Sequence, residues 1–251
     1  MYYSEYGNRE NNTIVFLHGA AATDTFCNQY CFQNKYHLVV PHLYGSGKEV
    51  NETYEPQKTI LAIGEIVQGL GKNKVTLMGH SLGGELAVAM VTQYEHLFDK
   101  AVFLSAYVCA TEKSIKFYEK MAKYSCHMLK LSWLIRLQAK YWHYTKEQAD
   151  FMAEYASKIT PEQYVAWFRY RIFLDELTDY SKVKIPMLAI CGKKETKEMR
   201  NSISELGRRN PNCKTIFLEK ANHDFPLRQA YRLNPILLDF IESQAESDGY
   251  N

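Results

Sequence analysis

The chain has 251 residues, 46% of them hydrophobic, and its 30 lysines and arginines against 28 acidic residues give a net charge of +2. This near balance, without a long basic block, argues against a protein that binds nucleic acid. The N-terminal residues do not resemble a signal peptide and no segment is apolar enough to span a membrane, so we expect a cytoplasmic protein.

Short apolar segments alternate with helical patterns along most of the chain. An edge strand is expected at residues 2–6, and strands separated by helices predict a mainly parallel sheet covered by helices on both faces. The other predicted strands are 13–17, 37–40, 74–78, 100–104, 185–191 and 215–218. The predicted helices are 59–70, 82–94, 197–209 and 234–243.

Residues 111–179 interrupt this alternation. They contain no clear strand pattern, and Thr160, followed by proline and then by Gln163, is a typical helix start. We therefore expect a core made of residues 1–110 and 180–251, with residues 111–179 as a helical insertion. Apolar residues recur at helical spacing in this insertion, for example Leu129, Trp133, Ile135 and Leu137.

The segment Gly79-His80-Ser81-Leu82-Gly83 joins a buried strand pattern directly to a helical pattern. Such a turn forces the serine into a sparsely populated backbone conformation and requires small residues two positions to either side of it. It also exposes the serine hydroxyl at the edge of the sheet, close to the N–H groups that begin the next helix. We interpret Ser81 as an activated nucleophile, and the alternative is an ordinary glycine-rich turn with a capping serine.

Activation of a serine requires two further groups. A neutral imidazole must accept the hydroxyl proton, and a carboxylate must hold that imidazole in the correct tautomer. Our candidates are His223 as the base and Glu195 as the acid, although Glu195 lies in the charged stretch 193–198 that would ordinarily be a solvated surface. Three aspartates are alternatives for the acid: Asp175, Asp179 and Asp224.

Five motifs, in chain order, resemble those of the α/β-hydrolase family, in particular its small, cap-bearing serine hydrolases. They are residues 14–19 ending in His-Gly, residues 39–47, the segment around Ser81, residues 184–195 and residues 219–225. The resemblance implies an α/β-hydrolase fold with a helical cap, and it places Ser81, Glu195 and His223 in the family's order of nucleophile, acid and histidine. The family commonly has aspartate where this chain has His42 and Glu195.

The resemblance also implies an oxyanion hole, formed by the backbone N–H groups of Ala20 and Leu82. We expect His18 and His80, which flank the site, to support loops and not to transfer protons. Neither a cofactor nor a metal is expected, since Cys27 and Cys31 lack a second ligand pair. The six cysteines are expected to be mostly reduced and buried.

The insertion is rich in aromatic residues. We expect most of them to pack within the insertion and against the core, and a few to face Ser81. A cap of this kind would form an apolar pocket with little positive charge, which suits an uncharged ester or a short to medium acyl group.

The sequence therefore predicts a serine hydrolase that cleaves small carboxylic esters through an acyl-Ser81 intermediate. The same three residues could instead cleave a thioester or a carbon–carbon bond, and a non-catalytic ligand receptor on the same scaffold is a further alternative. Haloalkane and epoxide chemistry is set aside because it needs a carboxylate at position 81. The polar tail at residues 246–251 is expected to be frayed.

Overall fold

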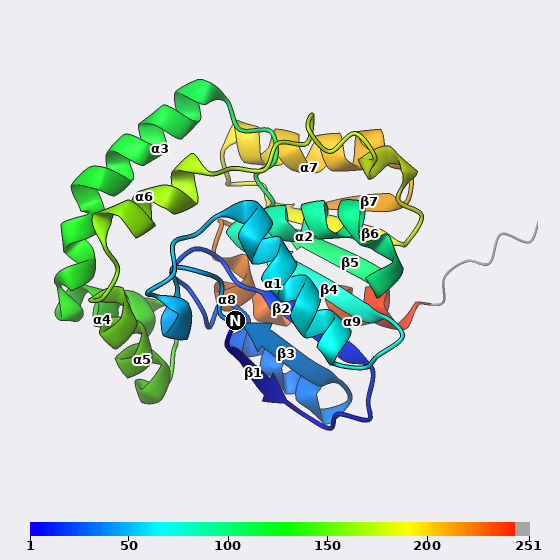
Figure 1. Ribbon diagram of the computed structural model, residues 1–251, viewed down its shortest axis with the longest axis horizontal. Helices are drawn as coiled ribbons and strands as arrows, with labels where there is room; N and C mark the ends of the chain where they lie inside the picture. The colour runs from blue at the N-terminus through cyan, green and yellow to red at the C-terminus, as the bar shows by residue number, and fades with distance from the viewer. Residues whose placement is uncertain (244–251) are drawn as a thin grey trace, which may run out of the picture.

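The computed structural model describes residues 1–243, so the tail at 246–251 lies outside the described residues. Its strands are β1 (Tyr3–Tyr6), β2 (Thr13–Leu17), β3 (His37–Pro41), β4 (Val75–His80), β5 (Phe98–Leu104), β6 (Met187–Gly192) and β7 (Cys213–Leu218). They form one seven-stranded sheet in the order β1-β3-β2-β4-β5-β6-β7 (Figure 1). The edge strand β1 is antiparallel to β3 and the other pairs are parallel, which confirms the predicted mainly parallel sheet.

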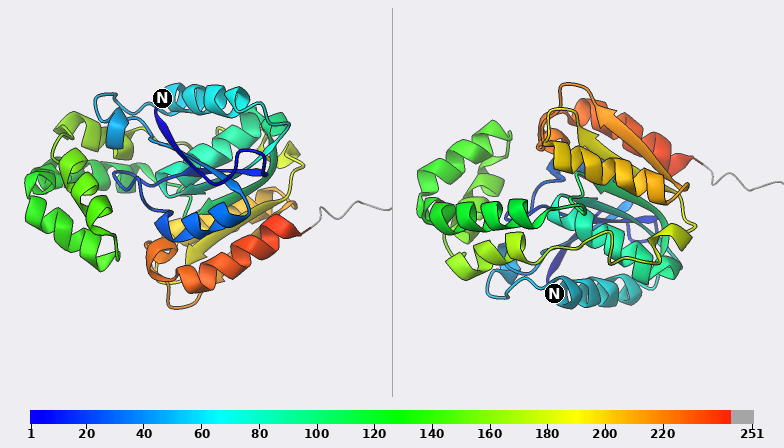
Figure 2. Two further views of the ribbon diagram at one scale, coloured as in Figure 1. Left: turned by 90° about the horizontal axis from the view of Figure 1, so that it is seen from below. Right: turned by 90° about the horizontal axis from the view of Figure 1, so that it is seen from above.

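Helices cover both faces of this sheet, as Figures 1 and 2 show. Those on one face are α1 (Pro56–Gly69), α2 (Leu82–Gln93) and α7 (Lys197–Arg209). Those on the other are the 3-10 helix η1 (Cys27–Asn34), α8 (Phe225–Arg228) and α9 (Ala230–Glu242).

Alternate side chains of β2 show why both faces need a cover. Val15 and Leu17 pack with α1 and α2 in one hydrophobic cluster, while Ile14 and Phe16 pack with η1 and α9 in another. Successive strand residues point to opposite faces, so a strand between two layers of helices is apolar at nearly every position. All five residues of β2 are buried.

Two helices begin earlier than the sequence predicts. Helix α1 begins at Pro56, because proline is well suited to the first helical position, where its missing N–H is not needed. Helix α9 begins at Ala230 and contains Pro235 in its interior. Proline in a helix interior removes one backbone hydrogen bond and is rare there. The sequence therefore predicts a helix that begins just before Pro235, at residue 234.

Four α-helices and two short 3-10 helices connect β5 to β6, and no strand lies among them in the described chain. The α-helices are α3 (Glu112–Ser125), α4 (Ser132–Tyr141), α5 (Lys146–Ala156) and α6 (Pro161–Arg169). The helix start predicted at Thr160 is confirmed: its hydroxyl accepts the N–H of Gln163 at 3.2 Å, and the Gln163 side chain accepts the N–H of Thr160 at 2.8 Å. The four α-helices lie together beside one end of the sheet (Figures 1 and 2).

None of the helices described for residues 1–243 is long and apolar enough to cross a membrane. All six cysteines are free thiols, and Cys126, Cys191 and Cys213 are buried whereas Cys31 is exposed.

Candidate active site

Ser81 lies at the turn between β4 and α2. Its backbone has φ 54° and ψ −118°, a region that residues other than glycine rarely adopt. The Ser81 N–H donates to the carbonyl of Leu104 at 2.8 Å, and the Ser81 carbonyl accepts the N–H of Glu85 at 3.0 Å. The strained serine is therefore held from both sides, as is common at functional sites.

Gly79 and Gly83 allow this turn to form. A Cβ atom added to Gly79 would lie 2.0 Å from the carbonyl oxygen of Gly83, and one added to Gly83 would lie 2.0 Å from that of Leu17. The requirement for small residues on both sides of Ser81 is therefore confirmed.

We expect the substitution Gly83→Ala to reduce the free energy of unfolding by about 3 kcal/mol, because the backbone carbonyl that the new Cβ atom meets cannot move aside as a side chain can. The matched control is Gly64→Ala in the middle of α1, where an added Cβ meets no atom within 4 Å. That variant should gain about 0.5–1 kcal/mol from helix propensity. Urea unfolding of both proteins measures the two effects, and equal effects would contradict the steric account.

His223 and Glu195 follow β7 and β6 and form a hydrogen bond, with 2.7 Å between His223 Nδ1 and Glu195 Oε2. Glu195 Oε1 accepts the Ser105 hydroxyl at 2.8 Å and the Gly192 N–H at 2.7 Å. Burial opposes the charge of Glu195, but the hydrogen bonds from His223, Gly192 and Ser105 outweigh it and lower the pKa of this carboxyl. The ionised acid thus holds the proton of His223 on Nδ1, which leaves Nε2 free to accept one.

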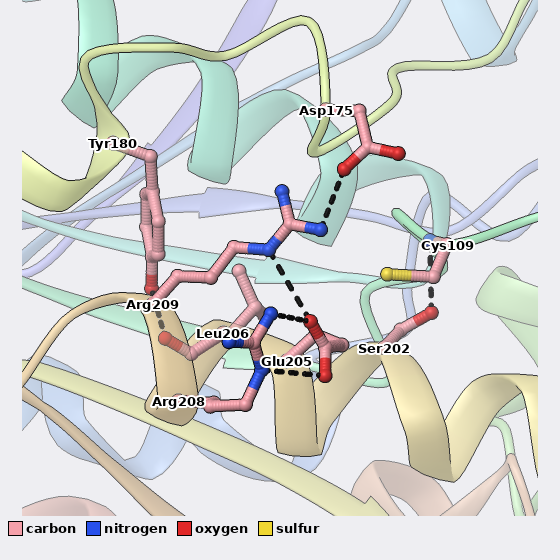
Figure 3. A network of polar contacts seen from close by, with 8 residues as sticks. All are labelled: Cys109, Asp175, Tyr180, Ser202, Glu205, Leu206, Arg208 and Arg209. Carbon is pink, nitrogen blue, oxygen red and sulfur yellow. Dashed lines mark hydrogen bonds and ion pairs between the residues drawn. The ribbon is translucent and has the colours of Figure 1, made fainter.

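The three alternative acids lie elsewhere. Asp175 forms an ion pair with Arg209 at 2.5 Å, and Figure 3 shows its carboxylate directed at that guanidinium. Asp179 pairs with a lysine three residues further on at 2.7 Å, and Asp224 precedes α8. In the described chain no hydrogen bond or ion pair joins any of these side chains to His223.

Ser81, Glu195 and His223 line one cavity of about 340 Å³. Tyr118 of α3 and Phe168 beside it in α6 form part of the wall, with 6.2 Å between their ring centroids. The other lining residues are Tyr107, Arg171, Lys194, Thr196 and Met199. The structure therefore brings the three predicted site residues to one cavity, under two helices of the segment between β5 and β6.

One expectation about the cavity is wrong: it is not poor in positive charge, since Arg171 and Lys194 line it. Most aromatic side chains of the segment are buried or half-buried, as expected, although Trp133 is 64% exposed. The sequence around Arg171 and Lys194 contains no periodic pattern that predicts their position at the cavity.

The predicted oxyanion-hole donors are the backbone N–H groups of Ala20, in the loop after β2, and of Leu82, next to Ser81 in the chain. Leu82 is the first residue of α2, and Ala20 follows Gly19, where an added Cβ would lie 3.6 Å from the Cβ of Ser81. Within residues 1–243, neither N–H donates to another protein group. Both donors are therefore available to a ligand at Ser81, and their role as an oxyanion hole stays a prediction.

His18 and His80 contact backbone groups around the site. His18 Nδ1 donates to the Gly19 carbonyl at 2.7 Å, and its Nε2 accepts the Leu43 N–H at 3.0 Å. His80 Nε2 donates to the His223 carbonyl at 2.9 Å. Burial lowers the pKa of His18 to about 4 and that of His80 to about 3, so both rings are neutral at pH 7. This geometry fits the loop-supporting role that the sequence suggested.

His42, where the resemblance implied aspartate, is also a buried neutral ring. Its Nδ1 accepts the N–H of Lys48 at 3.1 Å, and its ring packs edge-on against Tyr2 and Phe151. Burial lowers its pKa to about 3, helped by repulsion from His18 when that ring is protonated and from the positive charge of Lys48.

His42 should make the protein sensitive to acid. Because its pKa is about 3 when folded and 6.5 ordinarily, the unfolded chain binds a proton that the folded one does not over this range. Its contribution to stability is complete above pH 6.5 and is lost as the pH falls, by about 1.4 kcal/mol per pH unit. His42→Asn keeps an acceptor for Lys48, so the difference in unfolding free energy between wild type and variant should shrink with this slope from pH 6 to 4. A difference independent of pH would show that folding does not change the pKa of His42.

Comparison with known proteins gives the family of this chain. A profile of the alpha/beta hydrolase family matches residues 14–234. The chain therefore belongs to the alpha/beta hydrolase family, which confirms both the resemblance and the predicted fold. A search of curated proteins found no significant match.

Solved structures share the fold at low sequence identity. A carboxylesterase from Nitrososphaera gargenis is 17% identical, with 96% of this chain and 93% of that chain covered and a TM-score of 0.75. An enol-lactonase from Burkholderia xenovorans is 15% identical, with 96% of each chain covered and a TM-score of 0.72. A meta-cleavage product hydrolase variant is 19% identical, with 95% and 93% covered and a TM-score of 0.71.

Sequence analysis missed Ser105, which supports Glu195, and Arg171. Ser105 directly follows β5, at the strand edge where the other site residues also lie, and that position was the available signal. Arg171 follows α6 without any motif of its own.

Proposed function

We propose that this protein is a serine hydrolase that cleaves small carboxylic esters through an acyl-Ser81 intermediate. The observation that carries the proposal is the hydrogen bond of 2.7 Å between His223 Nδ1 and the ionised Glu195, in the cavity that Ser81 lines. No metal or cofactor is needed for this chemistry.

The first half of the reaction acylates Ser81. His223 Nε2 accepts the hydroxyl proton as Ser81 Oγ attacks the ester carbonyl, and Glu195 stabilises the imidazolium that forms. The N–H groups of Ala20 and Leu82 donate to the oxyanion, helped by the positive end of the α2 dipole. The intermediate collapses as the C–O bond breaks and the leaving alkoxide takes the proton from His223.

The second half releases the acid. Water gives a proton to His223 Nε2 as its oxygen attacks the acyl carbon, and collapse of this second intermediate breaks the bond to Ser81 Oγ, which regains the proton. The products are one alcohol and one carboxylic acid, and the enzyme is restored.

We propose further that residues 111–179 act as a cap over a core of residues 1–110 and 180–251. Tyr118 and Phe168 supply an apolar wall to the cavity. At about 340 Å³ the cavity is near the small end of the range for ligand pockets, about 300–1,000 Å³, which favours short to medium acyl groups.

A turnover screen with p-nitrophenyl esters of increasing acyl length tests the proposal, with Ser81→Ala as the blank. We expect release of p-nitrophenol that depends on Ser81 and is fastest for short to medium chains. If the protein turns over only thioesters, or only substrates cleaved at a carbon–carbon bond, the proposed ester bond is wrong but the roles of Ser81, Glu195 and His223 stand. Tight ligand binding without any turnover would instead indicate a receptor.

A further inference from the structure

Arg171 is a half-buried cation on the wall of the reactive cavity. Its side chain is 10% exposed and pairs with Glu85, a fully buried residue on α2 one helical turn after Ser81. Arg171 Nη1 also donates to the Trp167 carbonyl at 3.3 Å, and the guanidinium lies 5.1 Å from the ring centroid of Tyr107. The group is therefore held in one place before any ligand binds.

These contacts do not use the whole guanidinium. Arginine has five N–H donors, and the contacts with Glu85 and Trp167 occupy two of them. The Arg171 Nε is buried without a hydrogen-bond partner in the described chain. Within the described residues Glu85 Oε2, the second oxygen of its ion-pair partner, is also buried without a partner, so Nε is not a donor for a ligand. The donors left for a ligand are the Nη N–H groups that the contacts with Glu85 and Trp167 do not use.

Lys194 adds a second positive charge to the same cavity. Its backbone N–H donates to the Ala221 carbonyl at 3.0 Å, which fixes the residue next to Glu195. Its ammonium forms no ion pair within residues 1–243. The Glu195 carboxylate is hydrogen-bonded to His223, so the charged side chains of the cavity that remain for a ligand are Arg171 and Lys194.

We infer, on the basis of the proposed function, that the substrate is an ester whose acyl part ends in a carboxylate, which Arg171 binds while Lys194 attracts it from the rim. A guanidinium matches the two oxygens of a carboxylate, and a buried site strengthens the contact. Glu85 already pairs with Arg171 and offsets part of its charge, so the site suits a single negative charge better than a doubly charged phosphate.

Two esters of the same chain length test this inference. The mono-p-nitrophenyl ester of adipic acid carries a terminal carboxylate, where p-nitrophenyl hexanoate has a methyl group. The readout is the ratio of kcat/KM for the two esters, after the rate with Ser81→Ala is subtracted for each. We expect wild type to favour the adipate ester and Arg171→Gln to reduce the ratio about 10- to 100-fold, the range of a charged hydrogen bond. Lys194→Gln should reduce it less, since an exposed charge is screened by salt.

A nearby arginine provides the matched control. Arg169 pairs with Glu119 at 3.1 Å on the surface, so Arg169→Gln should leave the ratio unchanged. Because Arg171→Gln leaves Glu85 buried and unpaired, the double substitution Glu85→Gln with Arg171→Gln is measured beside it and should lose the same preference. A wild-type ratio near one that neither variant changes would overturn the inference and leave the serine hydrolase intact. Failure to hydrolyse either ester, together with failure throughout the ester screen, would overturn the proposed function and this inference with it.

Discussion

Replacement of Ser81 by alanine is expected to lower kcat for ester hydrolysis by about 10⁶-fold, the order of loss that follows removal of the nucleophile from a serine protease. His223→Ala should cost about as much, because serine and base act as one unit. Initial rates of p-nitrophenol release at saturating ester measure both. The control is Ser157→Ala, whose hydroxyl bonds to the Glu154 carbonyl at 2.6 Å on the surface and which should keep the wild-type rate.

A rate of more than about 1% of wild type in Ser81→Ala would contradict this prediction. The hydroxyl would then contribute too little to be the attacking group, and the strained turn around it would need another explanation.

Glu195→Gln is expected to lower kcat by about 10⁴-fold, as the equivalent change does in a serine protease. The contacts of Glu195 determine which way the amide must point. Ser105 and Gly192 both donate to Oε1, so the amide oxygen takes that position and the NH₂ group faces His223. Nδ1 must then accept, which places the proton on Nε2 and removes the base.

Two comparisons make the Glu195 result specific. Glu195→Asp should keep partial activity, because it preserves the charge and shortens the reach by roughly 1.5 Å. Asp224→Asn should keep the wild-type rate, because Asp224 is next to His223 in sequence but its side chain does not bond to the ring. Loss of activity in Asp224→Asn with a normal rate in Glu195→Gln would assign the acid to Asp224.

Much of this fold could be predicted because its strands are buried on both faces. In β2 four of the five residues are apolar, and every residue of β2 and β4 is buried, so short apolar segments mark the strands in the sequence. The site could be predicted from the positions of these strands. Ser81, Glu195 and His223 each follow a parallel strand, and the C-terminal ends of these strands meet at one edge of the sheet.

The helices between β5 and β6 were harder because their apolar residues do not lie on one face. In α4, Ile135 is 7% exposed, while Trp133 and Leu137 are 64% and 56% exposed. Residues two apart on a helix point in nearly opposite directions, so these apolar residues mark two faces and the sequence does not say which one packs.

Arg171 was missed for a related reason. Its partner Glu85 is 86 residues away in sequence, and nothing in the local pattern around either residue brings the two together. A charge in the interior is explained only by the tertiary contacts that surround it.

The most direct test of the central claim, that Ser81 is a nucleophile activated by His223, is reaction with a fluorophosphonate followed by intact-mass and peptide analysis. We expect one adduct per chain, located on Ser81 and formed far more slowly in His223→Ala. An adduct that persists in Ser81→Ala, or no adduct on the wild-type protein, would contradict it.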